Sequence, residues 1–299
     1  MADPSRHARA NGGAPPGGGA ADPSSAPAGR RKTPWPLAVV AVLFVVVPFL
    51  TWYWTWFGRG LGDAEIERYL REGNARHTQH ALSQVAEKIE KGEPGAGRWN
   101  RQVVALAANP SPDVRMTAAW VMGLEHRSDE FRAALARLVE DPEAIVRRNA
   151  ALALVRFGDP RCRPELRAML GPVTVSARTE GTAQTALTDG TPVKRDSLLV
   201  KYNVEPNLVE ELRSPVPGRV EKAYVKEGDS WRAGAELFRI APDAQQVENA
   251  LLGLAYLGTA EDLPEVERYA RGVEGMPEGL KTKAARTAEA IRRRSGPNP

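Results

Sequence analysis

Apolar residues recur at helical spacing over two stretches of the chain. In both stretches, side chains three or four positions apart would line one face of a short helix. The sets with this spacing are Leu82, Val85 and Ile89; Phe131, Leu135, Leu138 and Val139; Val146, Ala150, Leu154 and Phe157; Val247, Leu251 and Leu254; and Leu280, Ala284, Thr287 or Ala288, and Ile291. Prolines and glycines stand at the breaks, where helices begin or end. The pattern predicts amphipathic helices over residues 58–170 and again over 243–294.

The pattern changes period between residues 171 and 242. This segment is rich in Val, Thr, Gly and Pro, and its apolar positions alternate as half-buried strands require. Two similar blocks lie within it, at 180–202 and 217–240. Each block has a turn glycine, Gly190 or Gly228, with an apolar residue three and nine positions later. We therefore expect an all-β domain that is either inserted in the helical array or appended across it.

A third pattern is the uncharged apolar run Trp35–Phe57, which is 23 residues long. That length is enough to cross a bilayer with some tilt, and aromatic residues crowd its C-terminal end, as they do at the headgroup level. A basic cluster precedes the run, so the positive-inside rule places the N-terminus in the cytoplasm. We expect one uncleaved membrane span at 35–57. A cleaved signal peptide and a buried helix of a soluble protein are the alternatives.

Most of the net positive charge of the chain lies in its N-terminal residues. The chain has 299 residues and a formal net charge of +4. Residues 1–34 hold five basic and two acidic residues, and 20 of the 34 are Ala, Gly or Pro, which predicts a disordered tail. The remainder is almost neutral, with 36 basic and 35 acidic residues. This balance argues against nucleic acid as a partner.

The helical stretch contains an internal repeat. Residues 113–119 (DVRMTAA) and 145–151 (IVRRNAA) superpose at a spacing of 32 residues and share the pattern V-R-x-x-A-A. The pattern resembles HEAT repeats, in particular the short HEAT-like repeats of phycobilisome lyases, and residues 249–270 resemble them again. The resemblance implies a solenoid in which paired alanines allow close approach of helices. A plain helical bundle is the alternative.

The second β block resembles the half-motif of biotinyl/lipoyl domains and of membrane fusion (periplasmic adaptor) proteins. SPVPG (214–218) is similar to the A-P-x-x-G entry of that family, and VKEGD (225–229) to its V-x-E-G-D turn. Trp231, Gly234 and Leu237 follow the family pattern, and the first block is a looser copy with Asp196 in place of Gly234. The resemblance implies two halves that form a flattened barrel-sandwich.

The carrier function of that family is not expected here. Asn207 occupies the position where carrier domains have the modified lysine, and an amide cannot be linked to biotin or lipoate. The long helical hairpin of membrane fusion proteins is also missing from this sequence. The resemblance therefore implies a domain that makes protein contacts.

The sequence offers little other chemistry. His77 and His80 lie one helical turn apart, but no H-E-x-x-H motif accompanies them. Cys162 is the only cysteine and is expected to be buried and inert. We expect no catalytic residue, no metal and no cofactor, a small-molecule substrate is not expected, and the chain is predicted not to be an enzyme.

The residues expected to contact a partner are Trp231 and Arg232, at the tip of the second β hairpin, with Trp120 as a weaker candidate. The alternative for Trp231 is a core position, because the family usually has a buried Val there.

Together the patterns predict a multidomain, membrane-anchored protein with an α-helical HEAT-like solenoid and an all-β lipoyl-like barrel-sandwich hybrid. The predicted segments are a disordered cytoplasmic tail (1–34), a transmembrane helix (35–57), HEAT-like helical repeats (58–170), a lipoyl/biotinyl-like β domain (171–242) and C-terminal HEAT-like helices (243–294).

We expect a non-enzymatic scaffold or adaptor subunit of a bacterial envelope complex, with protein partners and a candidate role in transport. Its location would be the inner membrane, with the N-terminus in the cytoplasm and the bulk of the chain in the periplasm. An assembly factor for an inner-membrane complex, such as a respiratory one, is the first alternative. A lyase-like HEAT enzyme is the alternative from another class.

Overall fold

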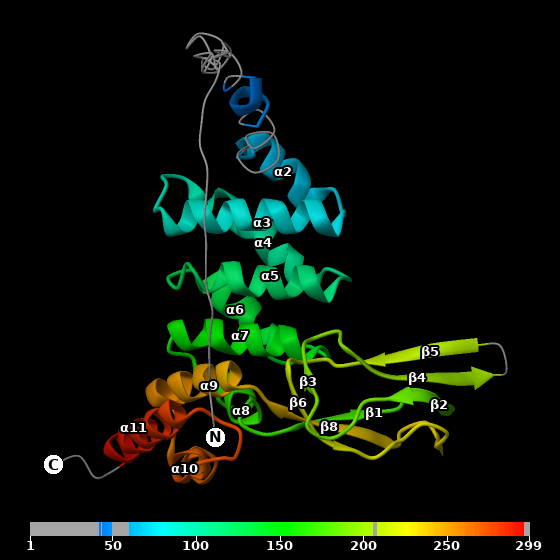
Figure 1. Cartoon of the computed structure of the whole chain (residues 1–299). Helices are drawn as coiled ribbons and strands as arrows, with labels where there is room; N and C mark the ends of the chain where they lie inside the picture. The colour runs from blue at the N-terminus through cyan, green and yellow to red at the C-terminus, as the bar shows by residue number, and fades with distance from the viewer. Residues whose placement is uncertain (1–41, 43, 50–59, 206–207, 296–299) are drawn as a thin grey trace, which may run out of the picture. The chain divides into compact units, whose positions relative to one another are not determined.

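The computed structural model describes residues 42, 44–49, 60–205 and 208–295. The chain divides into two units, Met1–Arg59 and Gly60–Pro299. In the first unit, the described residues 42 and 44–49 are helical. The second unit contains the helices and strands labelled in Figure 1, and these form two separate hydrophobic cores, one among the helices and one among the strands.

The helices of the second unit follow one another in pairs. In each pair a shorter helix, here called the A helix, precedes a longer B helix. The pairs are α2 (Asp63–Arg71) with α3 (Ala75–Glu90), α4 (Asn100–Ala105) with α5 (Pro112–Met122), α6 (Asp129–Leu138) with α7 (Ala144–Arg156), α8 (Arg163–Ala168) with α9 (Ala244–Leu257), and α10 (Leu263–Arg271) with α11 (Glu278–Ser295). Short 3-10 turns adjoin three of the A helices, at η1 (Ala96–Trp99), η2 (Leu106–Ala108), η3 (Pro160–Cys162) and η4 (Ala260–Asp262).

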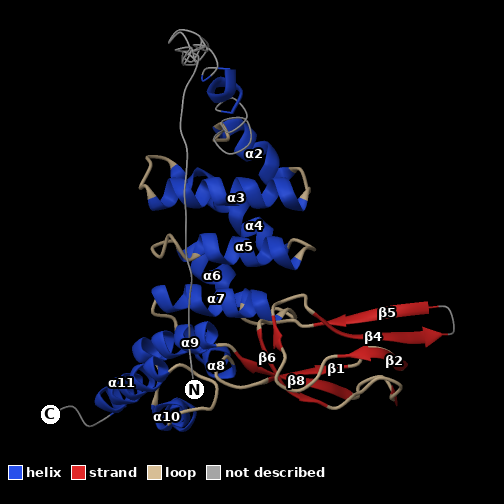
Figure 2. Ribbon diagram, in the orientation of Figure 1, coloured by secondary structure: helices blue, strands red, loops and turns tan. Residues whose placement is uncertain are grey.

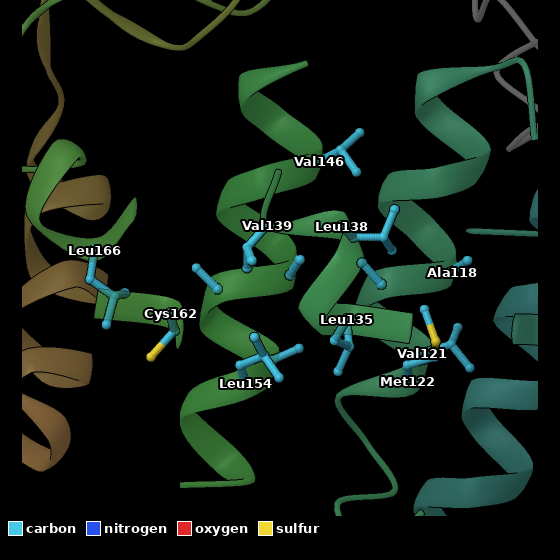
Figure 3. Close-up of a cluster of buried hydrophobic side chains, with 14 of the residues drawn as sticks. Ala118, Val121, Met122, Leu135, Leu138, Val139, Val146, Leu154, Cys162 and Leu166 are labelled. Carbon is cyan, nitrogen blue, oxygen red and sulfur yellow. The ribbon is translucent and has the colours of Figure 1, made fainter. Parts of the chain in front are cut away.

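The B helices contact one another in the order α3, α5, α7, α9, α11 (Figure 1). Small residues allow this stacking. Ala118, Ala119, Ala150 and Ala151 are fully buried, and Figure 3 shows Ala118 within a cluster of side chains from α5 to α8. The predicted role of the paired alanines is confirmed, and the helices form a HEAT-like stack.

A β module interrupts the fourth helix pair. The chain leaves the helical stack after α8 and returns at α9, so the module is inserted in the array. The helices on either side of it still correspond, because Leu154 and Gly158 of the α7 region match Leu254 and Gly258 at a constant spacing of 100 residues. Both leucines are completely buried.

Two close contacts show that the stacking register is the same before and after the insertion. A Cβ built on Gly123 would lie 2.8 Å from the Cβ of Ala153, which joins α5 to α7. A Cβ built on Gly253 would lie 3.1 Å from Cγ2 of Val155, which joins α7 to α9. Gly123 and Ala153 are 30 positions apart, and Val155 and Gly253 are 98 positions apart. Each separation is two fewer than the repeat spacing at that junction, which is 32 before the insertion and 100 across it. The inserted module therefore preserves the offset between successive B helices, although the atoms closest to Gly253 belong to Leu166 of α8.

The module consists of two antiparallel sheets of four strands each (Figure 2). The strands are β1 (Val173–Ser176), β2 (Gly181–Ala186), β3 (Pro192–Val193), β4 (Leu198–Glu205), β5 (Leu208–Arg213), β6 (Gly218–Ala223), β7 (Ser230–Trp231) and β8 (Glu236–Pro242). Their order is β1-β8-β6-β3 in one sheet and β5-β4-β2-β7 in the other. Adding four to each strand number, and counting on from β8 to β1, converts one order into the other. The two halves of the module therefore have the same topology and are related by a twofold arrangement.

Equivalent residues of the two halves lie 38 positions apart. Asp196 and Gly234 both adopt left-handed backbone, with φ of 64° and 84°. Asp196 is the only non-glycine residue with positive φ in the described chain, and Asp tolerates this region better than most residues. The substitution of Asp for Gly noticed in the sequence thus preserves the turn conformation.

The predicted barrel-sandwich is wrong in one respect, because the described strands do not close into a barrel. At one end of each sheet stands a strand of two residues, β3 or β7, and each pairs with one neighbour only. Strands this short cannot carry a ladder from one sheet to the other. The module is a pair of separate open sheets.

The predicted membrane-anchored fold and the inner-membrane location are also contradicted. No helix among the described residues is both long enough and apolar enough to span a membrane. Most of the predicted span Trp35–Phe57 lies outside the described residues.

Candidate protein-binding face

The arginine of the V-R-x-x-A-A pattern fixes the loops at one end of the B helices. Arg115 donates through Nη1 to the carbonyls of Asn109 and Pro110, at 2.9 and 3.1 Å. Its Nε and Nη2 bind both carboxylate oxygens of Asp141 in the next repeat, at 2.7 and 2.9 Å. Burial alone would raise the pKa of Asp141, but Arg115 and the Glu143 amide lower it overall. The bidentate pair therefore holds two neighbouring repeats together.

Arg147 repeats this arrangement 32 residues later. It donates through Nη1 to the carbonyls of Asp141 and Pro142, at 2.8 and 3.0 Å. Its Nε binds Glu165 of α8 at 3.0 Å. Successive repeats are thus joined by the same contacts, which give the B helices a common orientation.

One side of α5, α7 and α9, which we call the B-helix face, carries exposed and half-buried residues, and three of the half-buried ones, Leu124, Ile145 and Leu152, also pack against the helical core. It is built from equivalent residues at spacings of 32 and 100. Its four rows are Asp113, Ile145 and Gln245; Thr117, Asn149 and Asn249; Trp120, Leu152 and Leu252; and Leu124, Arg156 and Tyr256.

The third row makes the face apolar. Trp120 is 44 % exposed and Leu252 is 59 % exposed, while Leu152 between them in the repeat order is half-buried. Tyr256, one helical turn beyond Leu252, is 66 % exposed. Large apolar side chains that stay exposed at equivalent positions of a repeat array are typical of a surface that binds another protein.

Charge on the B-helix face is sparse. Asp113 pairs with Arg195, which projects from the β module. Arg156 is exposed, and among the described residues it forms no ion pair or side-chain hydrogen bond. The face therefore keeps one cation free for a partner.

A polar clamp holds the two connections of the β module. Gln246 of α9 donates to the Met169 carbonyl at 2.6 Å and accepts from Nη1 of Arg148 at 2.5 Å. Burial lowers the pKa of the Arg148 guanidinium to about 10. The Asp243 carboxylate, at the N-terminus of α9, accepts a hydrogen bond from the backbone N–H of Gln246 at 2.7 Å. The residues where the chain leaves and re-enters the stack are thus bonded through one buried glutamine.

A second buried carboxylate joins the fourth and fifth helix pairs. Asp262 is completely buried and pairs with Arg163 at 3.2 Å and Arg167 at 2.6 Å. It also accepts from the Thr259 amide at 2.8 Å. Burial alone would raise its pKa, but the Thr259 amide and the two arginines lower it overall.

The structure places the predicted contact residues as follows. Trp231 is half-buried, its indole Nε1 donates to the Thr179 carbonyl at 3.1 Å, and its ring centroid lies 5.2 Å from that of Tyr202. Arg232 is exposed, and contact through these two residues stays a prediction. Trp120 belongs to the B-helix face. Asn207 lies outside the described residues.

Other residues considered from the sequence do not gather into a site. Cys162 is fully buried, and burial raises the pKa of its thiol to about 12. His77 contacts Glu72 at 3.1 Å and stacks on Tyr69. In the part of the chain that the structure describes, no group of three or more His, Cys, Asp or Glu residues could hold a metal ion.

Sequence reasoning missed the B-helix face except for Trp120. The 32-residue spacing was visible, and extending it from Trp120 leads directly to Leu152. Leu252 lies in the segment 249–270 that resembles the repeat, but the 32-residue spacing does not lead to it, because the insertion increases the spacing to 100 residues. A search for the same repeat across the β segment would have located it.

Fold and face together define a helical repeat protein with an inserted β module and an open surface on its B helices. Residues 101–184 match the family model of HEAT repeats. The chain therefore carries HEAT-like repeats, which are general protein-interaction modules and indicate protein partners. No curated protein shows a significant match to the chain.

Proposed function

We propose that the protein is a non-enzymatic scaffold that binds protein partners through the B-helix face. The observation that supports this proposal most directly is the exposure of Trp120 and Leu252 at equivalent positions of the repeat. Tryptophan is among the residues that contribute most to binding energy in protein interfaces. A face repeated along a solenoid also gives an elongated surface suited to a protein ligand.

Cys162 is not suited to act as a nucleophile. A thiol whose pKa is about 12 is almost entirely protonated at neutral pH, and the thiolate is the reactive form. The residue also has no access to solvent. A lyase-like activity on a chromophore would instead be indicated by colour that copurifies with the protein.

We further propose that the β module is an unmodified relative of biotinyl/lipoyl domains that serves as an adaptor surface, with transport as a candidate process. The motif at 214–240, the twofold strand order and the paired turns at Asp196 and Gly234 support this relationship. The expected intact mass of the purified protein is that of the unmodified chain. A mass increase on any lysine would contradict the proposal.

Substitution on the B-helix face tests the binding function. We expect Trp120→Ala and Leu252→Ala to reduce the yield of partners in affinity capture of the full-length protein, because each removes exposed apolar area and little core packing. Ala133→Ser, at an exposed position of the A helix α6, is the matched control and should leave the yield unchanged. Equal yields from all three variants and the wild type would contradict the proposal.

A further inference from the structure

We infer that a pocket between the fourth and fifth helix pairs binds a phosphate monoester group, which displaces the side chain of Glu261 from two arginines. The pocket lies where η3 and α8 meet η4 and has a volume of about 370 Å³. It is lined by Pro160, Arg161, Arg163, Pro164, Arg167 and Glu261. None of these residues belongs to the B-helix face, so the inference is independent of the proposed function.

The first argument is that the three arginines of the pocket have unused donors. Arg161 donates to the Asp159 carboxylate through Nε and Nη2. Arg163 and Arg167 also form their side-chain hydrogen bonds through Nε and Nη2. In the part of the chain that the structure describes, Nη1 of each arginine makes no hydrogen bond. Three guanidinium NH₂ groups are therefore available to a ligand, and arginine is the residue best suited to bind phosphate oxygens.

The second argument is that two of these arginines are already held in place. Asp262 is completely buried and accepts from Nε of Arg167 at 2.8 Å and from Nη2 of Arg163 at 3.2 Å. The side chain of Arg163 is only 20 % exposed, and that of Arg167 is 39 % exposed. A side chain that is fixed beforehand loses less entropy when a ligand binds, so this pocket is preorganised.

The third argument is that Glu261 occupies the pocket weakly. Its carboxylate accepts from Nη2 of Arg163 at 3.4 Å and from Nη2 of Arg167 at 3.5 Å. A well-formed hydrogen bond between a guanidinium and a carboxylate is about 2.7–2.9 Å long. The side chain of Glu261 is also 76 % exposed, and exposed ion pairs contribute little to stability. An incoming anion can therefore displace it at small cost.

The number of donors distinguishes phosphate from carboxylate as the ligand. With Glu261 turned toward solvent, three guanidinium groups face only two carboxylates, those of Asp159 and Asp262, which leaves an excess of positive charge. A carboxylate ligand would only repeat the contact that Glu261 already makes. A phosphate monoester has a charge of about −1.5 to −2 at pH 7 and three acceptor oxygens. It therefore offers one oxygen for each unused Nη1 group.

The test measures the affinity of the full-length protein for dye-labelled peptides by fluorescence anisotropy. The probe is a phosphoserine flanked by two glycines on each side, and the control peptides have serine or glutamate in its place. We expect the phosphoserine peptide to bind at least about tenfold more tightly than either control.

Competition with inorganic phosphate identifies the source of the group. Equal affinity for inorganic phosphate and the phosphoserine peptide would assign the pocket to small soluble phosphate monoesters. An affinity for inorganic phosphate at least about tenfold lower would assign it to a phosphorylated side chain of a partner protein.

Two variants connect the affinity to the pocket. Glu261→Gln should strengthen binding of the phosphoserine peptide about threefold, because it removes the competing carboxylate. Arg161→Gln should weaken it about tenfold, because it removes a charged donor. Glu289→Gln and Arg293→Gln are the matched controls. They make the same two charge changes at an exposed ion pair on α11, outside the pocket, and should leave the affinity unchanged.

Three results would overturn the inference. The first is equal binding of the glutamate and phosphoserine peptides, and the second is no binding of the phosphoserine peptide at millimolar concentration. The third is the same affinity for Glu261→Gln as for Glu289→Gln, because Glu261 would then not compete with the ligand. Far-UV circular dichroism checks the folding of Arg161→Gln. If that variant is unfolded, the comparison of Glu261→Gln with Glu289→Gln decides.

Discussion

Gly218 lies against the carbonyl oxygen of Ala241. That oxygen occupies the space that a side chain at position 218 would need. A Cβ built on Gly218 would lie 2.1 Å from that oxygen, and a Cβ built on Gly181, in the other half of the module, would lie 2.5 Å from Cδ2 of Tyr202. Tyr202 and Ile240, the neighbour of Ala241, are equivalent at the spacing of 38 residues. Both halves therefore need a glycine at this close approach, although the nearest atom is a backbone oxygen at Gly218 and a side-chain carbon at Gly181.

We predict that Gly218→Ala lowers the free energy of unfolding by about 3 kcal/mol, because backbone atoms cannot move aside as a flexible side chain can. Urea unfolding followed by tryptophan fluorescence measures the effect. Gly279→Ala is the control, since a Cβ at Gly279 would meet nothing within 4 Å, and it should be neutral or slightly stabilising. A loss at Gly218 no larger than that at Gly279 would show that the two strands are further apart than described.

Asp262 is one residue at which pH should affect stability. Its pKa is lowered in the folded protein, so its contribution is complete above the unfolded value of about 3.9 and is lost as the pH falls through the folded value. We predict that Asp262→Asn costs about 2 kcal/mol at pH 7, less than for a fully buried pair, because Arg167 is 39 % exposed.

The measurement is the thermal midpoint of wild type and Asp262→Asn between about pH 7 and pH 2. The difference between the two proteins should shrink below pH 4 as the wild-type carboxylate is protonated. A difference that stays constant over this range would exclude a role of the charge.

Some residue roles followed from the sequence and others did not. The burial of Cys162 and the turns at Gly190 and Gly228, which both adopt positive φ, agree with simple rules for those residue types. The buried carboxylate of Asp262 did not follow, because its arginine partners lie 95 to 99 positions earlier in the chain. A local pattern carries no information on such a pair.

At the scale of elements, the packing of one B helix on the next depends on small residues at defined positions. We predict that Gly123→Ala destabilises the protein by about 1–2 kcal/mol, because the new methyl would meet the Cβ of Ala153. Ala153→Gly should cost about 1 kcal/mol alone, through helix propensity and lost packing. In the double variant, removal of the Ala153 methyl should recover part of the loss.

A double-mutant cycle measures this coupling from urea unfolding of the four proteins. A favourable interaction energy of at least about 0.5 kcal/mol is expected for residues in direct contact. Strict additivity would show that α5 and α7 are not in contact at this point.

The elements themselves were largely predictable. Apolar periodicity identified the helices, and the alternation of apolar residues identified the strands. The function of the arginine in V-R-x-x-A-A was not predictable, since its acceptors are loop carbonyls and an acid of the following repeat. Barrel closure was predicted wrongly because a resemblance in one half-motif does not report how long the terminal strands are, and β3 and β7 have only two residues each.

At the scale of the whole molecule, the unchanged register of α7 and α9 implies that the helical stack does not need the β module. We predict that a protein lacking residues 171–242 folds into a continuous helical array. The remaining connection, Met169, Leu170 and Asp243, has three residues, the same length as the loop between η2 and α5. Far-UV circular dichroism should show the helical signal with a cooperative thermal transition.

A non-cooperative transition of the shortened protein would show that the module supports the stack. Gln246 and Tyr269 should retain their partners in the shortened protein, because both bind carbonyls at residues 169 and 170 that remain. The sequence left open whether the module was inserted or appended, because the resemblance of residues 249–270 to the repeat does not show that α8 and α9 form one helix pair.

The central claim is that the B-helix face is the protein-binding surface. Its most direct test places a photo-crosslinking amino acid at position 120, 252 or 133 of the full-length protein and identifies the crosslinked peptides by mass spectrometry. We predict that positions 120 and 252 crosslink to the same partner and that position 133, on the A-helix side, does not. Crosslinks at 133 equal to those at 120 and 252, or different partners at 120 and 252, would contradict the claim.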